Sequence, residues 1–112
     1  MAEPSIEEKV EELQALEKQL QSILMQKQTL QVELNQIHTA TEEVSSTSDD
    51  IYKMVGEVLI KADKQKVLSD LGEKKKISDL RIKSIEKQES SLEESATKLR
   101  NEIQKAISQQ KR

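Results

Sequence analysis

The chain has 112 residues, no cysteine, no phenylalanine, no tryptophan and one tyrosine, and 35% of its residues are charged. A chain of this length holds one domain at most, and so few aromatic residues leave little to fill a globular core, so an enzyme domain is not expected. The lack of cysteine excludes a disulfide scaffold and a thiolate-held metal. No apolar run reaches the roughly 18 residues of a membrane span, and Met1 to Ile6 lack a signal-peptide pattern, so we expect a cytoplasmic protein.

The composition is typical of long helices and coiled coils. Leu, Ile and Val total 28 residues, which is enough for a buried seam despite the high charge. The only proline is Pro4 and the only glycines are Gly56 and Gly72, so long stretches contain nothing that would stop a helix.

The first predicted helix spans residues 5–44. With Ile6 at position a of a heptad, nine of the twelve a and d positions up to Val44 are apolar. Pro4 and Ser5, followed by Glu7 and Glu8, form a suitable helix start.

The second predicted helix spans residues 64–110, with Asp63 as its N-cap. With Leu68 at position a, nine of the twelve a and d positions are again apolar. Gly72 lies inside this helix, where it costs about 1 kcal/mol relative to alanine, and nothing in the sequence explains it.

The two helices are expected to pair with each other in antiparallel orientation. Residues 1–44 carry a net charge of −6 and residues 64–112 a net charge of +5, which favours pairing between the halves over self-pairing. If residues whose numbers add up to 112 face each other across the two helices, apolar residues at a and d are paired. This alignment also brings Lys27 close to Glu89. The matched pairs are Ile6 with Ala106, Leu13 with Leu99, Leu16 with Ala96, Leu20 with Leu92 and Leu30 with Ile82.

Residues 45–63 predict a linker and a β-hairpin. Strands are expected at residues 51–55 and 58–61, because β-branched residues concentrate there, and Gly56 with Glu57 suits a type II′ turn. A continued helix or an irregular loop is the alternative. Because a lone hairpin is only marginally stable in water, these strands predict an oligomer built by strand pairing.

No catalytic or metal-binding constellation is found, so neither an enzyme nor a cofactor is expected. His38 is the only histidine, and the serines at 45, 46 and 48 have no nearby base. Gly72 to Lys76 lack the spacing of a phosphate loop. Nucleic-acid binding through the basic C-terminal half is disfavoured by the net charge of −3 and the missing aromatic residues.

Three segments resemble the β-type subunits of the archaeal prefoldin family. They are Met25-Gln-Lys-Gln-Thr-Leu30, the hairpin from Ile51 to Lys61, and Leu80-Arg-Ile-Lys-Ser-Ile-Glu-Lys-Gln-Glu89. Element order, length and spacing also agree over nearly the whole chain, whereas Gly72 departs from the pattern. The resemblance implies a mainly α fold, a long antiparallel coiled-coil hairpin with a short β-hairpin at the connection between its helices. It also implies a hexamer of two α and four β subunits around a β-barrel body.

The same resemblance implies an ATP-independent chaperone that binds unfolded polypeptides at the free ends of its coils and passes them to a group II chaperonin. A structural coiled-coil adaptor is the alternative, although it would not need the hairpin. The implied assembly residues are Ile51, Tyr52, Met54, Val55, Val58, Leu59 and Ile60. The implied client-binding residues are Ile6, Val10, Leu13, Leu24, Leu99, Ile103 and Ile107.

The implied client-binding residues form two groups, those at heptad positions a and d and those outside them. Val10, Leu24 and Ile107 lie outside a and d, and are expected to stay exposed if the coil ends separate. Apolar groups spread over several coils would hold a non-native chain through many weak contacts. The alternative is that all seven residues belong to the seam between the helices.

Overall fold

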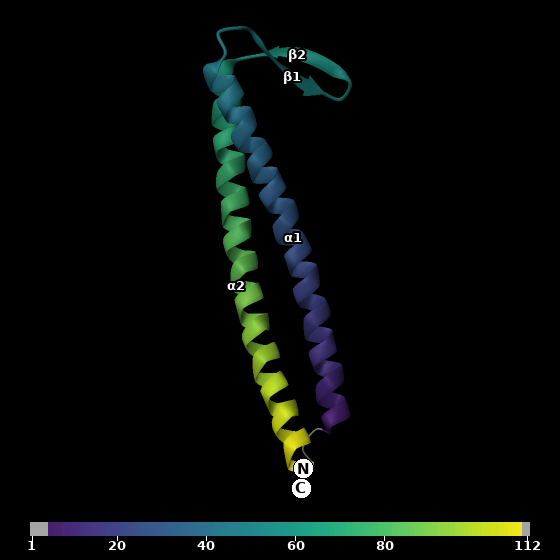
Figure 1. Cartoon of the computed structure of the whole chain (residues 1–112). Coiled ribbons are helices and arrows are strands. Elements are labelled where there is room, and N and C mark those ends of the chain that lie inside the picture. Colours follow the sequence, from purple (N-terminus) through teal and green to yellow (C-terminus); the bar gives the residue numbers. More distant parts are fainter. Residues whose placement is uncertain (1–4, 111–112) are drawn as a thin grey trace. The chain divides into compact units, whose positions relative to one another are not determined.

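The computed structural model describes residues 5–110, which form two long helices joined by a β-hairpin. The elements are α1 (Ile6–Ser46), β1 (Ile51–Val55), β2 (Val58–Ala62) and α2 (Lys64–Gln110), in that order (Figure 1). The predicted fold class, mainly α with a hairpin at the connection, is confirmed. The helix expected over residues 5–44 continues two residues further, and the second strand extends by one.

Both helices begin at polar caps. The backbone N–H of Glu8 donates to Ser5 Oγ over 3.1 Å, and the backbone N–H of Lys66 donates to Asp63 Oδ2 over 3.3 Å. Each such cap satisfies a backbone donor that the first turn leaves without a helical partner, which is worth about 1 kcal/mol. The predicted helix starts are therefore confirmed, while Pro4 lies outside the described residues.

The chain divides into two compact units. Unit 1 consists of the residues up to Gln28 together with those from Ser84 onward, and unit 2 is Thr29–Lys83. In unit 1, Lys9 of α1 contacts Glu102 of α2 over 3.8 Å, and Lys27 contacts Glu86 over 3.8 Å. These contacts show that α1 and α2 run antiparallel within unit 1.

The seam of unit 1 is buried as the heptads predict. Ala96 is fully buried, while Leu99 and Ile23 are 7% and 8% exposed. The other a and d positions of this unit are at least half-buried; they are Ile6, Lys9, Leu13, Leu16, Leu20, Lys27, Ile85, Glu89, Leu92, Ile103 and Ala106. Removal of the apolar side chains of this seam from water is the main term that holds the two segments together.

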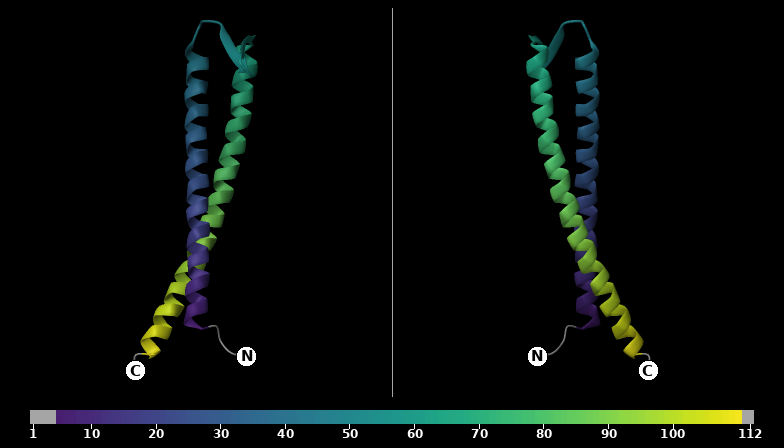
Figure 2. Two further views of the ribbon diagram at one scale, coloured as in Figure 1. Left: turned by 90° about the vertical axis from the view of Figure 1, so that its right-hand side faces the viewer. Right: turned by 90° about the vertical axis from the view of Figure 1, so that its left-hand side faces the viewer.

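The seam of unit 2 is closed by Leu30, Ile37 and Ser78, which are all buried. The α1 and α2 segments of this unit lie alongside each other in both views of Figure 2. In the α2 segment of unit 2, Lys75 is the one a or d position that is exposed, because its long chain allows the ammonium group to remain in water. Lys64 Nζ donates to the carbonyl oxygens of Ser45 and Thr47, over 3.3 and 2.8 Å, and so supplies the cation that the last turn of α1 lacks.

The hairpin has the predicted turn. Its strands pair antiparallel from Ile51 with Ala62 to Val55 with Val58, which leaves Gly56 and Glu57 as the two-residue connection. Gly56 has a φ of 62°, and no non-glycine residue among the described ones has a positive φ. A positive φ at the first central residue alone is the signature of a type II′ turn, so glycine is required there.

Candidate functional site

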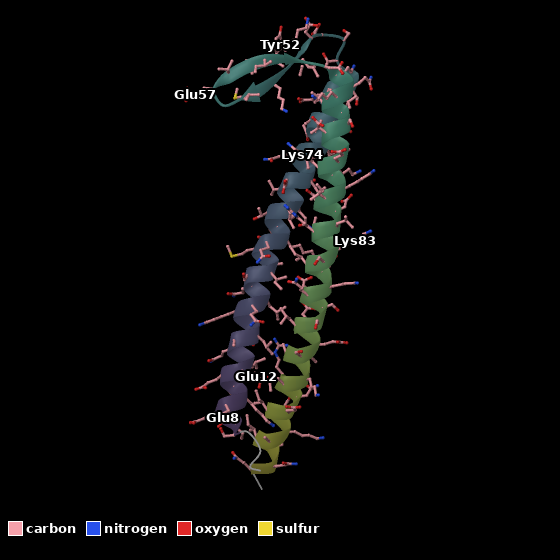
Figure 3. The ribbon with its side chains drawn as sticks, turned by 180° about the vertical axis from the view of Figure 1, so that it is seen from behind. Glu8, Glu12, Tyr52, Glu57, Lys74 and Lys83 are labelled. Carbon is pink, nitrogen blue, oxygen red and sulfur yellow. The ribbon has the colours of Figure 1, made fainter. Side chains whose placement is uncertain are left out.

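The hairpin presents apolar side chains on both of its faces. Six of them are more than half exposed, at 51–65%: Tyr52, Met54, Val55, Val58, Leu59 and Ile60. Cross-strand partners share a face, so Met54 and Leu59 lie on one side and Val55 and Val58 on the other. Figure 3 shows Tyr52 on β1 and Glu57 at the turn. Among the predicted assembly residues only Ile51 is half-buried. A hairpin with two apolar faces and two unpaired edges is incomplete as a single chain.

A groove lies between the hairpin and the first turns of α2. Tyr52 and Lys53 line one side, and the other side is lined by Val67, Asp70, Leu71, Glu73, Lys74 and Ile77. This surface was not predicted from the sequence. Ile77 could have indicated the groove, because it is apolar at a heptad position that faces outward. In the structure it is 52% exposed.

The predicted client-binding residues fall into three groups in unit 1. Leu24 and Ile107 are exposed, at 47% and 41%. Leu99 is buried in the seam at 7%. The remaining four are half-buried; they are Ile6, Val10, Leu13 and Ile103. The exposed pair is therefore available to a partner without any movement of the helices.

An open groove also runs beside the seam of unit 1, next to Ile23 and Leu92. It is lined by Gln19, Ser22, Ile23, Lys87, Gln88, Ser91 and Leu92. Ser22 and Ser91 are small, so they leave part of the apolar floor uncovered. This groove was not predicted from the sequence either, although the small serines of α2 could have indicated it.

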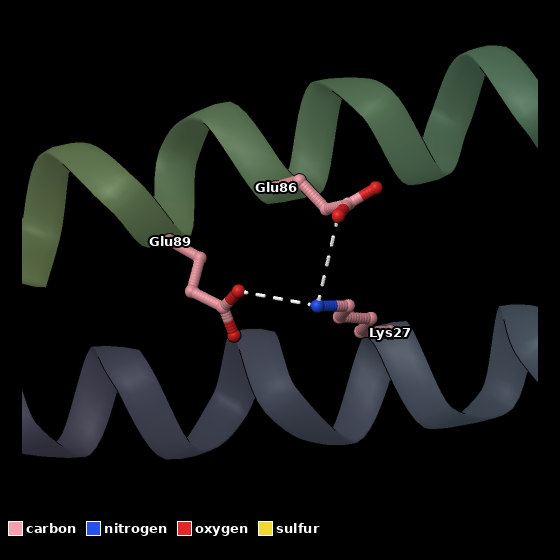
Figure 4. Close-up of polar contacts among 3 residues, drawn as sticks. All are labelled: Lys27, Glu86 and Glu89. Carbon is pink, nitrogen blue, oxygen red and sulfur yellow. Dashed lines mark hydrogen bonds and ion pairs between the residues drawn. The ribbon is translucent and has the colours of Figure 1, made fainter.

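A charged cluster lies in the seam of unit 1. Lys27 Nζ lies 3.3 Å from Glu89 Oε1 and 3.8 Å from Glu86 Oε2 (Figure 4). The Lys27 and Glu89 side chains are only 22% and 21% exposed. The predicted contact between Lys27 and Glu89 is confirmed, whereas Glu86 was not anticipated. An ion pair at a seam position specifies one alignment of the helices, because any slip would leave charges facing apolar residues.

The described residues offer little for catalysis. His38 Nε2 lies 3.1 Å from Glu42 Oε1, but both side chains are about 70% exposed. Within residues 5–110, no group of three or more His, Cys, Asp or Glu is placed to hold a metal ion. None of the helices in that range is long and apolar enough to cross a membrane.

Comparisons with known proteins identify the family. The model of the prefoldin subunit family matches residues 7–110. The prefoldin subunit beta of Pyrococcus furiosus is 34% identical over 106 residues, which covers 93% of this chain and 91% of that protein. This chain belongs to the prefoldin family.

Further relatives and a solved structure agree with that assignment. The prefoldin subunit beta of Pyrobaculum neutrophilum is 38% identical, with 93% of this chain and 84% of that protein covered. The crystal structure of the prefoldin beta subunit from Thermococcus strain KS-1 matches with a TM-score of 0.86 and 34% identity, over 93% of each chain. Prefoldin subunits are chaperone subunits and are not known as enzymes, so the chain has a chaperone-type role.

Proposed function

We propose that this chain is the β-type subunit of an ATP-independent cytoplasmic holdase. It assembles with prefoldin α subunits into a complex of two α and four β subunits. It binds unfolded polypeptides at the end of unit 1 and delivers them to a group II chaperonin. The observation that carries the proposal is the exposure of six large apolar side chains on the hairpin. The structural adaptor does not require such a surface.

Assembly through the hairpin follows from its two apolar faces. Full burial of a Val, Leu, Ile or Met side chain is worth about 1.5–3 kcal/mol, so the five on the hairpin, together with Tyr52, supply enough free energy to offset the entropy lost on association. The unpaired strand edges supply the backbone hydrogen bonds of a continuous sheet. Both contributions require neighbouring subunits with matching hairpins.

Client binding follows from the exposed Leu24 and Ile107. Each contact alone is weak, but several coils in one complex hold one client together, and avidity raises the overall affinity. Half-buried residues such as Val10 and Ile103 add further apolar surface when the helix ends separate. This mechanism needs no nucleotide, because each weak contact is released and replaced without chemical work.

Mixing the purified chain with a prefoldin α subunit tests the proposal. We expect a hetero-oligomer by size-exclusion chromatography with light scattering, and suppressed aggregation of a denatured client without nucleotide. Transfer of that client to a group II chaperonin is then measured by its refolding yield after ATP is added to the chaperonin. Failure to assemble, or aggregation at the rate of client alone, contradicts the proposal.

A pair of variants tests whether Leu24 and Ile107 bind clients. Leu24→Ser with Ile107→Ser should raise the chaperone concentration needed for half-maximal suppression by about threefold to tenfold, since about 1 kcal/mol or less is lost per coil and avidity multiplies the effect. The matched control is Gln28→Ser with Gln104→Ser, which alters two polar positions that are also exposed. Equal suppression by both variants would show that these two residues do not bind clients.

A further inference from the structure

The two sides of unit 1 differ in which heptad positions meet across the seam. Glu17 of α1 and Arg100 of α2, both at position e, lie 3.6 Å apart on one side. On the other side, Gln19 and Gln88, both at position g, line the same groove. Positions e and b of the two helices therefore share one side of the unit, and positions g and c share the opposite side.

The two sides also differ in chemistry. Positions e and b of unit 1 form the e flank, whose charged and apolar residues are Glu7, Val10, Glu17, Leu24, Glu86, Glu93, Arg100 and Ile107. Positions g and c form the g flank, whose charged residues are Glu8, Glu12, Lys98, Glu102 and Lys105. Alanine is the largest apolar residue of the g flank, and its groove reaches the seam at Ile23, which is only 8% exposed. The e flank alone thus combines large apolar side chains with an excess of carboxylates.

One carboxylate of the e flank lies at the level of Leu24. The contact between Glu17 and Arg100 fixes the register of this flank, and one heptad further along α1 the same register places Leu24 level with Glu93. Leu24 is 47% exposed, and Glu93 is exposed as well. A chain that covers Leu24 therefore passes close to the carboxylate of Glu93.

A second carboxylate lies near Val10, at the end of the unit. Glu7 precedes Val10 by three residues, so the two side chains are neighbours on successive turns of α1. Glu7 is exposed and Val10 is half-buried. The arrangement of an apolar side chain beside a carboxylate thus occurs twice on the e flank.

Glu7 and Glu93 differ from the other carboxylates of this flank in their surroundings. Glu17 and Glu86 each have a cationic partner, at 3.6 and 3.8 Å. Neither Glu7 nor Glu93 forms an ion pair with another residue of the range 5–110. Their charges are therefore available to a bound chain.

We infer that the e flank binds client segments in which lysine or arginine lies close to apolar residues, and that Glu7 and Glu93 set this preference. The inference rests on the proposed function, in which unfolded polypeptides bind unit 1. The apolar side chains of the client cover Val10, Leu24 and Ile107, while its basic side chains reach the two carboxylates. The g flank offers neither feature, so clients bind on one side of the coil.

The carboxylates contribute selectivity more than affinity. An exposed ion pair adds little by itself, because water and salt screen it. A client segment that brings its own carboxylates to the same positions is repelled. Several coils of one complex act on one client, so a small difference per coil is multiplied. Basic and acidic segments of equal apolar content should therefore differ measurably in affinity.

Two labelled peptides test the preference on the complex assembled with the α subunit. Both are unstructured and contain the same leucines and valines, but the residues between these are lysine in one peptide and glutamate in the other. By fluorescence anisotropy at low salt, we expect the lysine peptide to bind about fivefold more tightly or better. The difference should shrink to about twofold or less in about 1 M salt, where charges are screened beyond about 3 Å. Equal affinities at low salt, or tighter binding of the glutamate peptide, would overturn the inference.

Charge reversal on each flank locates the preference. Glu7→Lys with Glu93→Lys should lower the ratio of the two affinities about fivefold, because the charge beside the apolar side chains changes sign. Glu8→Lys with Glu12→Lys is the matched control: it changes the net charge of the chain equally, on the g flank, and also replaces one glutamate in the first turn of α1. This control should leave the ratio within about twofold of the parent. An equal decrease in both variants, or no decrease in either, would overturn the assignment to the e flank.

The same measurements separate this inference from the proposed function. A complex that assembles, suppresses aggregation and binds both peptides equally refutes only the preference for basic clients. A complex that binds neither peptide and leaves client aggregation unchanged contradicts the proposed function as well.

Discussion

The hairpin and the seam of unit 1 contain similar apolar side chains but differ in how far these side chains are exposed to water. In the hairpin, Leu59 is 62% exposed and Val58 is 61% exposed, whereas in the seam Leu99 and Ile23 are below 10%. The difference arises from topology, because two helices of one chain can cover each other while two short strands cannot. The seam is therefore stable within a single chain, whereas the apolar surface of the hairpin remains exposed and available to partner subunits.

The largest expected effect comes from charging the hairpin. Val58→Asp with Ile60→Asp places two carboxylates on one face of the hairpin. We expect complete loss of the complex with the α subunit by light scattering, because burial of these charges would cost far more than the lost apolar contacts. The circular dichroism signal of the helices should be unchanged, because the seam does not depend on the hairpin. Lys53→Gln on the same face is the control and should still assemble.

Shortening a seam residue should instead destabilise the single chain. Leu99→Ala removes a side chain that is 7% exposed, and we expect the free energy of unfolding in urea to fall by about 2–3 kcal/mol. Leu24→Ala, at a position 47% exposed, should cost about 1 kcal/mol or less. Equal losses in the two variants would contradict the seam described for unit 1.

The charged cluster tests whether the seam is held by apolar burial alone. A double-mutant cycle with Lys27→Met and Glu89→Met should give a coupling energy of about 0.5–1 kcal/mol, because the pair is 3.3 Å apart and mostly shielded from water. The coupling should decrease as salt is added. Lys9 and Glu102, at 3.8 Å and with Glu102 43% exposed, form the control pair and should couple less. A coupling near zero for Lys27 and Glu89 would remove them as a determinant of register.

Sequence periodicity predicted the seam well because each heptad position maps onto one face of a helix. Ile37 and Ala96 were assigned to the seam, and the contact between Lys27 and Glu89 followed from the alignment of the two helices. The turn at Gly56 was predictable because one backbone conformation there demands glycine. These features depend on local geometry and on a single repeating pattern.

Other features depend on distances that a heptad does not encode. Glu86 joins Lys27 because a long side chain reaches across the seam from a flanking position. Lys64 binds the carbonyl end of α1 only because the hairpin returns α2 to that point. Heptad position also does not predict that Leu24 is 47% exposed and Val10 half-buried, since both occupy the same position. How much a flanking residue is covered depends on the side chains of the opposite helix.

The smallest expected effect is a gain in stability at Gly72. A Cβ there would meet no atom within 4 Å, and the position is exposed on the helical backbone of α2. Gly72→Ala should therefore raise the free energy of unfolding by about 0.5–1 kcal/mol through reduced entropy of the unfolded chain. Gly56→Ala is the opposing control, because a φ of 62° is strained for alanine and should cost about 1–2 kcal/mol. A loss of stability on Gly72→Ala would contradict the open surroundings described for this position.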